Sequence, residues 1–204
     1  MTGYPAFFDQ APTITMRDPL AALLGAADDG LIDYRYIDAV RLAGHSCPTV
    51  AGAWLMARAA TRALYPDEPA ERGGILVHMP AEESEGSTGV IAQLLTLITG
   101  AAAANGFHGI GGQFMRQSLL SFGPSSTGGI RFARSDNGTA VALELNLSGV
   151  PAPANLRPLL GAALAPDATG AQRAAFAHAW QDRVRRLLLE HADDPAVIQV
   201  TRLH

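Results

Sequence analysis

The stretch LAGHSCPT, residues 42–49, decides the fold because it connects two expected helices through a short elbow. After the elbow, apolar residues recur at three- and four-residue steps as far as Leu64, and this spacing predicts an amphipathic helix. Cys47 is expected to be the N-cap of that helix and Pro48 its first residue, since proline fits the first turn of a helix. The elbow therefore places the chain's single cysteine at a helix N-terminus.

A helix N-terminus favours the thiolate form of a cysteine. The unpaired backbone N–H groups there carry partial positive charge, which lowers the pKa of a thiol. The preceding helix is expected to start at Asp33 and to end at Gly44 with a left-handed C-cap, which puts His45 two residues before Cys47. A thiolate can ligate a metal or attack an electrophile, so this pair is a candidate metal or reactive-thiol site.

The composition is that of one globular domain. The 204 residues are 48% hydrophobic and 17% charged, which is enough for one substantial core. The net charge is -4 and the 15 basic residues form no stripe, so we expect no nucleic-acid partner. A single cysteine cannot form an intramolecular disulfide, and no apolar run approaches the roughly 18 residues of a membrane span. We expect a cytoplasmic protein that does not enter a membrane.

Helices and strands are mixed along the chain without strict alternation. The predicted elements are a short helix after Asp18, a strand at 74–79, a helix at 89–99, a hairpin turning at 136–138, helices at 156–164 and 171–191, and a strand at 197–203. This mixture predicts an α+β fold with a mostly antiparallel sheet of three to five strands packed with helices. We divide the chain into an N-terminal arm and short helix (1–33), a core (34–150) and a C-terminal helical extension (151–204).

The elbow and the segments after it resemble a known family. The sequence GHSCP, residues 44–48, opens a helix of small residues and resembles the His-x-Cys-Pro signature of proteins similar to the E subunit of formylmethanofuran dehydrogenase. The resemblance covers roughly residues 34 to 148 and continues through these segments: 74–79, 85–91, 98–100, 106–109, Arg116 and 119–120. It implies an α+β metal-binding domain that commonly pairs as a homodimer, with a transition metal, often zinc, near the elbow.

Two positions depart from the pattern of that family. The family often has a histidine where this chain has Ala43, and an Asp-Arg-Cys sequence where this chain has residues 88–90, Thr-Gly-Val. The ligand set must therefore differ, and the resemblance leaves His45 and Cys47 as the metal ligands. A zinc centre takes about four ligands. The other residues of a suitable kind are His78, Glu82, Glu83, Glu85 and His108.

Four further residues are candidates for a site around the elbow. Glu83 and Glu85 lie in an acidic loop between a strand and a helix, where either could act as a catalytic base. His108 stands among glycines that let backbone approach closely, and we treat it as a catalytic pocket residue. Arg116 could bind an anionic group of a cofactor or substrate through two parallel hydrogen bonds. A solvated loop and a surface arginine are the alternative interpretations.

Three functions are compatible with these residues. The first is a metal-dependent enzyme acting on a small molecule, with a transition metal, zinc first, at His45 and Cys47. The second is a non-enzymatic metal or haem binding or carrier protein. The third is a metal-free enzyme in which Cys47 is the nucleophile and His45 its base. We also expect a homodimer, because the apolar helix at 90–98 and the aromatic N-terminal segment need more cover than one small sheet supplies.

Overall fold

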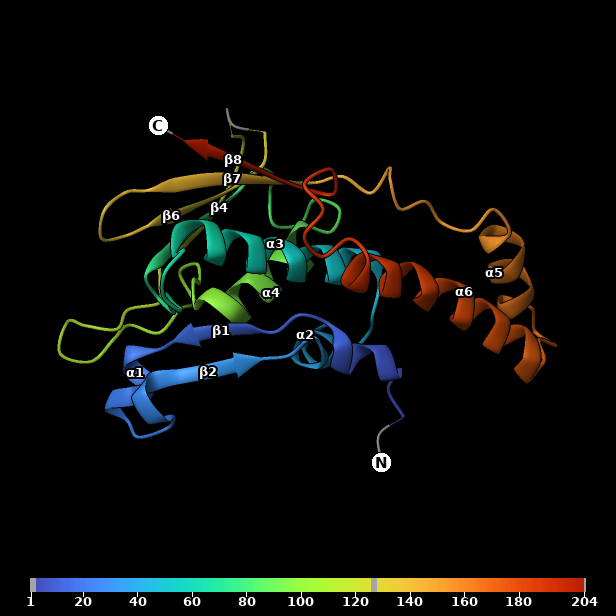
Figure 1. Cartoon of the computed structure of the whole chain (residues 1–204), viewed down its shortest axis with the longest axis horizontal. Coiled ribbons are helices and arrows are strands. Elements are labelled where there is room, and N and C mark those ends of the chain that lie inside the picture. Colours follow the sequence, from blue (N-terminus) through green and yellow to red (C-terminus); the bar gives the residue numbers. More distant parts are fainter. Residues whose placement is uncertain (1–2, 126–127, 204) are drawn as a thin grey trace.

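The structure is a computed structural model that describes residues 3–125 and 128–203, so residues 1 and 2 of the predicted arm and residue 204 of the predicted extension lie outside the described residues. Figure 1 shows two β-sheets on opposite sides of a helical layer that contains α3 (Pro48–Leu64) and α4 (Thr88–Thr99). The described residues form six α-helices and two mixed, mostly antiparallel sheets. The predicted α+β class is confirmed.

The larger sheet contains the predicted hairpin at its centre. Its strands lie in the order β5-β4-β6-β7-β8, and among the described strands of this sheet only the β4–β5 pair is parallel. The strands are β4 (Ile75–Met79), β5 (Leu120–Phe122), β6 (Ile130–Arg134), β7 (Ala140–Leu145) and β8 (Ile198–Leu203). These bounds confirm the predicted strand at 74–79, the hairpin and the last strand. The first and last of these strands each begin one residue later than predicted.

A smaller sheet of three strands lies on the other side of the helices. Its strands are β1 (Ile14–Arg17), β2 (Leu31–Tyr34) and β3 (Ala70–Glu71), in the order β2-β1-β3. From Phe8 onward the N-terminal segment contributes to the core, since Phe8, Ile14 and Met16 are buried. Strands of two to four residues are too short to give a clear period-two pattern, so the sequence did not predict this sheet.

Short helical elements surround the first strands of the smaller sheet. The element η1 (Ala6–Gln10) precedes β1, while α1 (Pro19–Leu23) and η2 (Asp28–Gly30) lie between β1 and β2. The helix α2 (Tyr36–Ala43) then leads from β2 to the elbow. Asp18 caps α1 as expected. The prediction that Asp33 starts the helix before the elbow is wrong, since Asp33 is paired in β2 with Thr15. Gly44 ends α2 with a left-handed φ of 73°, as predicted.

The central helix α3 forms as predicted, with Cys47 at its N-cap and Pro48 as its first residue. Eleven of its 17 residues are buried, so it is covered on almost every side. Trp54 is fully buried, and its indole N–H donates to the carbonyl oxygen of Pro12 at 2.9 Å. Because that bond crosses 42 residues, it ties the N-terminal segment to the core.

The helix α4 is less buried than predicted. Leu94, Leu95 and Ile98 are buried as expected, but Val90 is 39% exposed and Leu97 is only partly covered. Although apolar residues lie around most of α4, the helix is not packed on every side, because one side of it lines a cavity.

The C-terminal extension contains two packed helices, α5 (Leu156–Leu164) and α6 (Gly170–Leu189), before the strand β8. The bounds of α5 are those predicted, and α6 ends two residues earlier than predicted. The buried residues of α6 are Val184, Leu187 and Leu188, all in its last third, and Trp180 packs against the core as a partly buried side chain. Figure 1 shows α5 and the start of α6 standing out at one end of the molecule. No helix in the described part of the chain is long and apolar enough to cross a membrane.

Candidate functional site

The elbow holds His45 and Cys47 in different environments. Cys47 is only 9% exposed, and its Sγ accepts a hydrogen bond from the backbone N–H of Val50 at 3.4 Å. His45 is exposed, and its Nδ1 lies 2.9 Å from the carbonyl oxygen of Ala43. For that contact to be a hydrogen bond, Nδ1 must carry the proton, which leaves a lone pair on Nε2 of the neutral ring. The thiol of Cys47 thus accepts from the first turn of α3, and the imidazole of His45 is oriented by the carbonyl oxygen of Ala43.

Ser46, which lies between His45 and Cys47, is held by hydrogen bonds through both its carbonyl oxygen and its hydroxyl. The carbonyl oxygen of Ser46 accepts hydrogen bonds from Nε1 of Trp180 and Nε2 of Gln181, each at 3.0 Å. The hydroxyl of Ser46 lies 2.9 Å from that of Tyr36, a fully buried side chain of α2. Burial raises the pKa of Tyr36, so the phenol stays neutral. The elbow is therefore a rigid connection between α2, α3 and α6.

A cavity of about 340 Å³ lies between α4, the segment 102–105 and the edge strand β5, and it reaches Leu42 on α2. Its polar lining residues are Arg72, Glu83, Gln93, Thr96 and Asn105. Its larger apolar lining residues are Leu42, Leu97, Leu120 and Phe122. An apolar pocket with a few polar groups is typical of sites for small molecules.

The structure brings one predicted catalytic residue into this cavity and leaves two outside its lining. Glu83, Glu85 and His108 are all exposed, and of these three only Glu83 lines the cavity. Leu42 is three residues before His45, so their Cα atoms are at most about 11 Å apart. The elbow is therefore near the α2 side of the cavity, although neither His45 nor Cys47 lines it.

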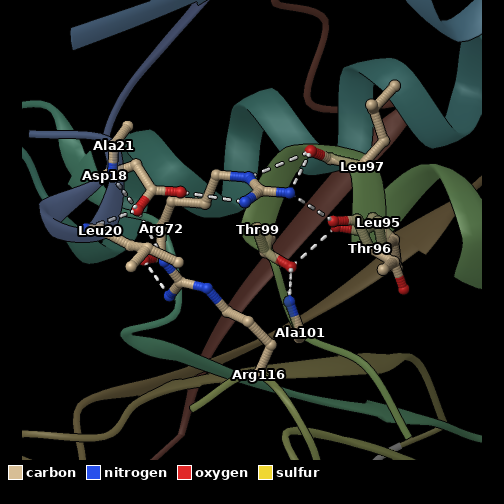
Figure 2. Close-up of polar contacts among 10 residues, drawn as sticks. All are labelled: Asp18, Leu20, Ala21, Arg72, Leu95, Thr96, Leu97, Thr99, Ala101 and Arg116. Atoms are coloured by element: carbon tan, nitrogen blue, oxygen red, sulfur yellow. Dashed lines mark hydrogen bonds and ion pairs between the residues drawn. The ribbon is translucent and has the colours of Figure 1, made fainter. Parts of the chain in front are cut away.

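Arg116, predicted to bind an anionic group, lies in a buried ion cluster. Figure 2 shows its guanidinium beside the Asp18 carboxylate, where Nη2 donates to Oδ1 at 2.7 Å. Its Nη1 donates to the carbonyl oxygen of Arg72. Burial lowers the pKa of Arg116, and the charge of Asp18 opposes this shift. Arg116 also lines a separate cavity of about 350 Å³ beside the glycine-rich segment, and its binding role stays a prediction.

Arg72 belongs to the same cluster, and its side chain binds carbonyl oxygens at the C-terminus of α4. Its Nη1 donates to Oδ2 of Asp18 at 3.0 Å, and its Nε and Nη2 each donate to the carbonyl oxygen of Leu97 at 3.3 Å (Figure 2). A cation at a helix C-terminus compensates the partial negative charge of the last carbonyl groups. One side of the 340 Å³ cavity is formed by α4, and Arg72 stabilises that side by binding the end of the helix.

Glycine is required where the backbone passes Arg116. Gly73 has a φ of +90°, and a Cβ built there would overlap Nη1 of Arg116. Gly100 has a φ of +74°, and a Cβ there would lie 3.2 Å from Cδ of Arg116. The arginine reaches Asp18 only because these two positions lack side chains.

Sequence reasoning missed Arg72, Gln93 and Asn105 as lining residues of the cavity. Arg72 precedes the Gly-Gly pair before β4, and nothing local indicates that it contacts Asp18, which lies 54 residues away. His78, named above as a residue of a suitable kind for a zinc ligand, has its Nδ1 2.9 Å from the hydroxyl of Ser121 across the β4–β5 pair. Its observed partner is thus a side chain on the neighbouring strand.

No family model and no curated protein sequence matches this chain. Within residues 3–125 and 128–203, no three His, Cys, Asp or Glu side chains are grouped so that one chain could hold a metal with all of them. The elbow supplies two donors of the kinds that zinc prefers, a thiol and an imidazole. A metal there would need its remaining ligands from water, a substrate or a second chain.

Proposed function

We propose that the protein binds a transition metal, zinc first, through Sγ of Cys47 and Nε2 of His45, and that it is an enzyme acting on a small molecule in the cavity lined by Glu83. The observation that carries this proposal is the hydrogen bonding of the elbow. Metal-ligating histidines usually donate their other ring N–H to a carbonyl or carboxylate, and Nδ1 of His45 has such a partner in the carbonyl of Ala43.

The environment of Cys47 supports the same assignment. Its Sγ accepts the backbone N–H of Val50 at the N-terminus of a 17-residue helix, so the sulfur is held in a fixed position beside the elbow. The donor set of one thiolate and one imidazole suits zinc. When bound, such a metal acts as a Lewis acid or lowers the pKa of a bound water.

The cavity supports an enzyme more than a simple carrier. A carrier needs no carboxylate beside a pocket, whereas Glu83 lines a cavity large enough for a small molecule. The carboxylate of Glu83 is suited to accept a proton from a substrate held there. The amide groups of Gln93 and Asn105, on the same lining, offer donors and acceptors that orient a polar ligand.

The metal-free thiol alternative has less support. In the described part of the chain, no hydrogen bond joins His45 to Cys47, since Nδ1 of His45 is engaged with Ala43 and Sγ of Cys47 accepts from Val50. A cysteine nucleophile needs a base within hydrogen-bond reach or another group that lowers its pKa. A haem carrier remains an outcome of the first experiment below.

The first experiment is elemental analysis with an absorption spectrum on tag-free protein. We expect close to one equivalent of metal per chain in the wild type, lost in Cys47→Ser and in His45→Ala. His191→Asn is the matched control, because His191 pairs with Asp194 away from the elbow and should keep the metal. A Soret band lost in the elbow variants would support haem instead, and metal content equal in all variants would contradict the proposal.

The second experiment separates enzyme from carrier. The metal-loaded protein is screened against small esters, amides and phosphoesters, and any turnover found is measured in Glu83→Gln and Glu85→Gln. We expect Glu83→Gln to lower kcat by about 10²-fold or more while the metal content stays the same. Glu85, which is exposed and outside the cavity lining, is the control for the loss of one carboxylate. Equal turnover in both variants would contradict the role of Glu83.

A further inference from the structure

A second cavity, of about 350 Å³, lies beside the glycine-rich segment. Of the residues that the structure describes, only Arg72 lines both this cavity and the one lined by Glu83. The polar side chains of the second cavity are Glu71, Arg72, Gln113, Arg116 and Ser135. Its larger apolar side chains are Pro19, Phe114, Met115 and Leu119. The metal enzyme proposed above does not use this cavity.

The guanidinium of Arg116 has more hydrogen-bond donors than its own chain uses. Arg116 is only 8% exposed, so water reaches little of it. A guanidinium has five N–H donors. Within residues 3–125 and 128–203 its partners are two oxygens, the carbonyl of Arg72 and one carboxylate oxygen of Asp18 (Figure 2). Nε and the remaining Nη hydrogens therefore need an acceptor, which a ligand in the second cavity can supply.

The charges around Asp18 are unbalanced. Its carboxylate, which is nearly fully buried, pairs with two guanidinium groups, those of Arg72 and Arg116. In the described part of the chain neither arginine pairs with another carboxylate, so one positive charge of the cluster lacks a counter-ion in contact. Burial lowers the pKa of Arg116, because its charged form is poorly solvated there. An anionic group bound in the second cavity would stabilise that charge.

A carboxylate on the same lining indicates that the ligand also carries a positive charge. Glu71, in β3, is exposed and lines the second cavity with Arg116. Its charge is close enough to oppose the lowering of the Arg116 pKa. Glu71 would repel a simple anion such as phosphate, whereas an ammonium group would pair with it. A ligand that suits both residues therefore carries a carboxylate and an ammonium group.

The glycine-rich wall of the second cavity has an unusual backbone. Gly111, Gly112 and Phe114 have φ values of 58°, 79° and 62°. A left-handed φ is ordinary for glycine but uncommon for an aromatic residue. Residues held in such conformations cluster at ligand-binding sites, where the surrounding structure compensates their cost. The position of Phe114 on the lining fits a wall that is shaped for a ligand.

We propose that the second cavity binds a free amino acid with an apolar side chain, through its carboxylate at Arg116 and its ammonium group at Glu71. Hydrogen bonds between a guanidinium and a carboxylate are charge-assisted and strong. A volume of about 350 Å³ is within the range of small-molecule sites, and the apolar side chains of the lining suit an aliphatic ligand. The proposal goes beyond the metal function and does not depend on it, because neither His45 nor Cys47 lines this cavity.

The test is isothermal titration calorimetry of the metal-free full chain with L-leucine. We expect saturable binding. N-acetyl-leucine lacks the ammonium group and leucinamide lacks the carboxylate, so each should bind about 10-fold more weakly or worse. Glu71→Gln should weaken the binding of leucine by a similar factor and change the binding of N-acetyl-leucine little, because that ligand has no charge for Glu71 to pair with.

The matched control is Glu68→Gln, which removes the same charge from an exposed residue outside the lining and should bind leucine as the wild type does. Arg116→Lys, with its fold checked by circular dichroism, should weaken the binding of both leucine and N-acetyl-leucine. The Glu71 comparison leaves the buried cluster intact, so it decides the question even where Arg116→Lys does not fold. No binding of leucine at millimolar concentration, equal affinity for leucine and N-acetyl-leucine, or tighter binding of inorganic phosphate would overturn the proposal.

Discussion

Asp18 accepts hydrogen bonds from four donors that come from three distant parts of the chain. Its Oδ1 caps α1 by accepting from the backbone N–H groups of Leu20 and Ala21, and also accepts from Arg116. Its Oδ2 accepts from Arg72. The carboxylate is 4% exposed, so these partners replace the water that it would otherwise bind. One acidic residue thereby joins the smaller sheet, α4 and the glycine-rich segment.

We expect Asp18→Ala to lower the free energy of unfolding by about 3–5 kcal/mol, because the substitution leaves Arg116 buried without its counter-ion. Loss of the α1 cap is part of this cost and is worth about 1 kcal/mol. Urea unfolding followed by circular dichroism measures it. Asp9→Ala, an exposed aspartate on η1, removes the same charge and should change the midpoint little. Equal midpoints for the two variants would show that the cluster does not stabilise the fold.

Asp193 predicts a pH dependence of stability. Its pKa lies below the ordinary 3.8, first because Arg58 donates a hydrogen bond to it at 2.8 Å. A depressed pKa in the folded state contributes stability that is present above 3.8 and is lost as the pH falls through the folded value. The carboxylate is 67% exposed and solvent screens it, so we expect Asp193→Asn to cost only about 0.5 kcal/mol near neutral pH. The cost should vanish in acid, and a pH-independent difference would contradict the assignment.

The long helices α3 and α6 differ in how much of their length is buried in the core. The helix α3 is buried over most of its length, whereas the buried residues of α6 all lie in its last third. Leu187 is fully buried there, close to the end of a helix whose other end projects from the molecule. The stability of α6 should therefore depend on a few residues at one end.

Leu187→Ala should destabilise the protein by about 3 kcal/mol, because it removes buried methyl groups and leaves a cavity. Leu23→Ala on α1 removes the same atoms from a side chain that is 61% exposed and should cost well under 1 kcal/mol. Thermal unfolding of the two variants at matched concentration gives the comparison. A similar shift in both would mean that α6 is not anchored at Leu187.

Elements with strong local signals could be predicted from the sequence. The N-cap at Cys47, the left-handed Gly44 and the hairpin around residues 136–138 depend on neighbouring residues, and each forms as expected. The strands β1, β2 and β3 could not be predicted, because they contain four residues or fewer and are held by pairing between distant segments. The sequence therefore predicted a helix start at Asp33, although this residue lies in β2.

At the scale of the whole molecule, the contacts that shape the candidate site cross long stretches of sequence. Arg116 is 98 residues from Asp18, and Trp180 is 134 residues from Ser46. No local pattern indicates such pairs, so the sequence predicted the residue types of the elbow and the position of its helix but not what surrounds them. It also placed Glu83 and Glu85 in one loop, both exposed, without indicating that only Glu83 lines the cavity.

The elbow belongs to both the core and the C-terminal extension, since α2, α3 and α6 all contribute to it. A metal ligated there would stabilise the folded chain by binding it and not the unfolded one. The central claim is therefore that Sγ of Cys47 and Nε2 of His45 bind the same metal ion.

X-ray absorption at the zinc edge, on the zinc-loaded wild type beside Cys47→Ser, tests that claim most directly. We predict a sulfur shell at about 2.3 Å and nitrogen or oxygen scatterers at about 2.0–2.1 Å in the wild type, with the sulfur shell absent in Cys47→Ser. Imidazole scattering should be lost in His45→Ala. A wild-type spectrum without sulfur, or no zinc retained after dialysis, would contradict the proposed metal site.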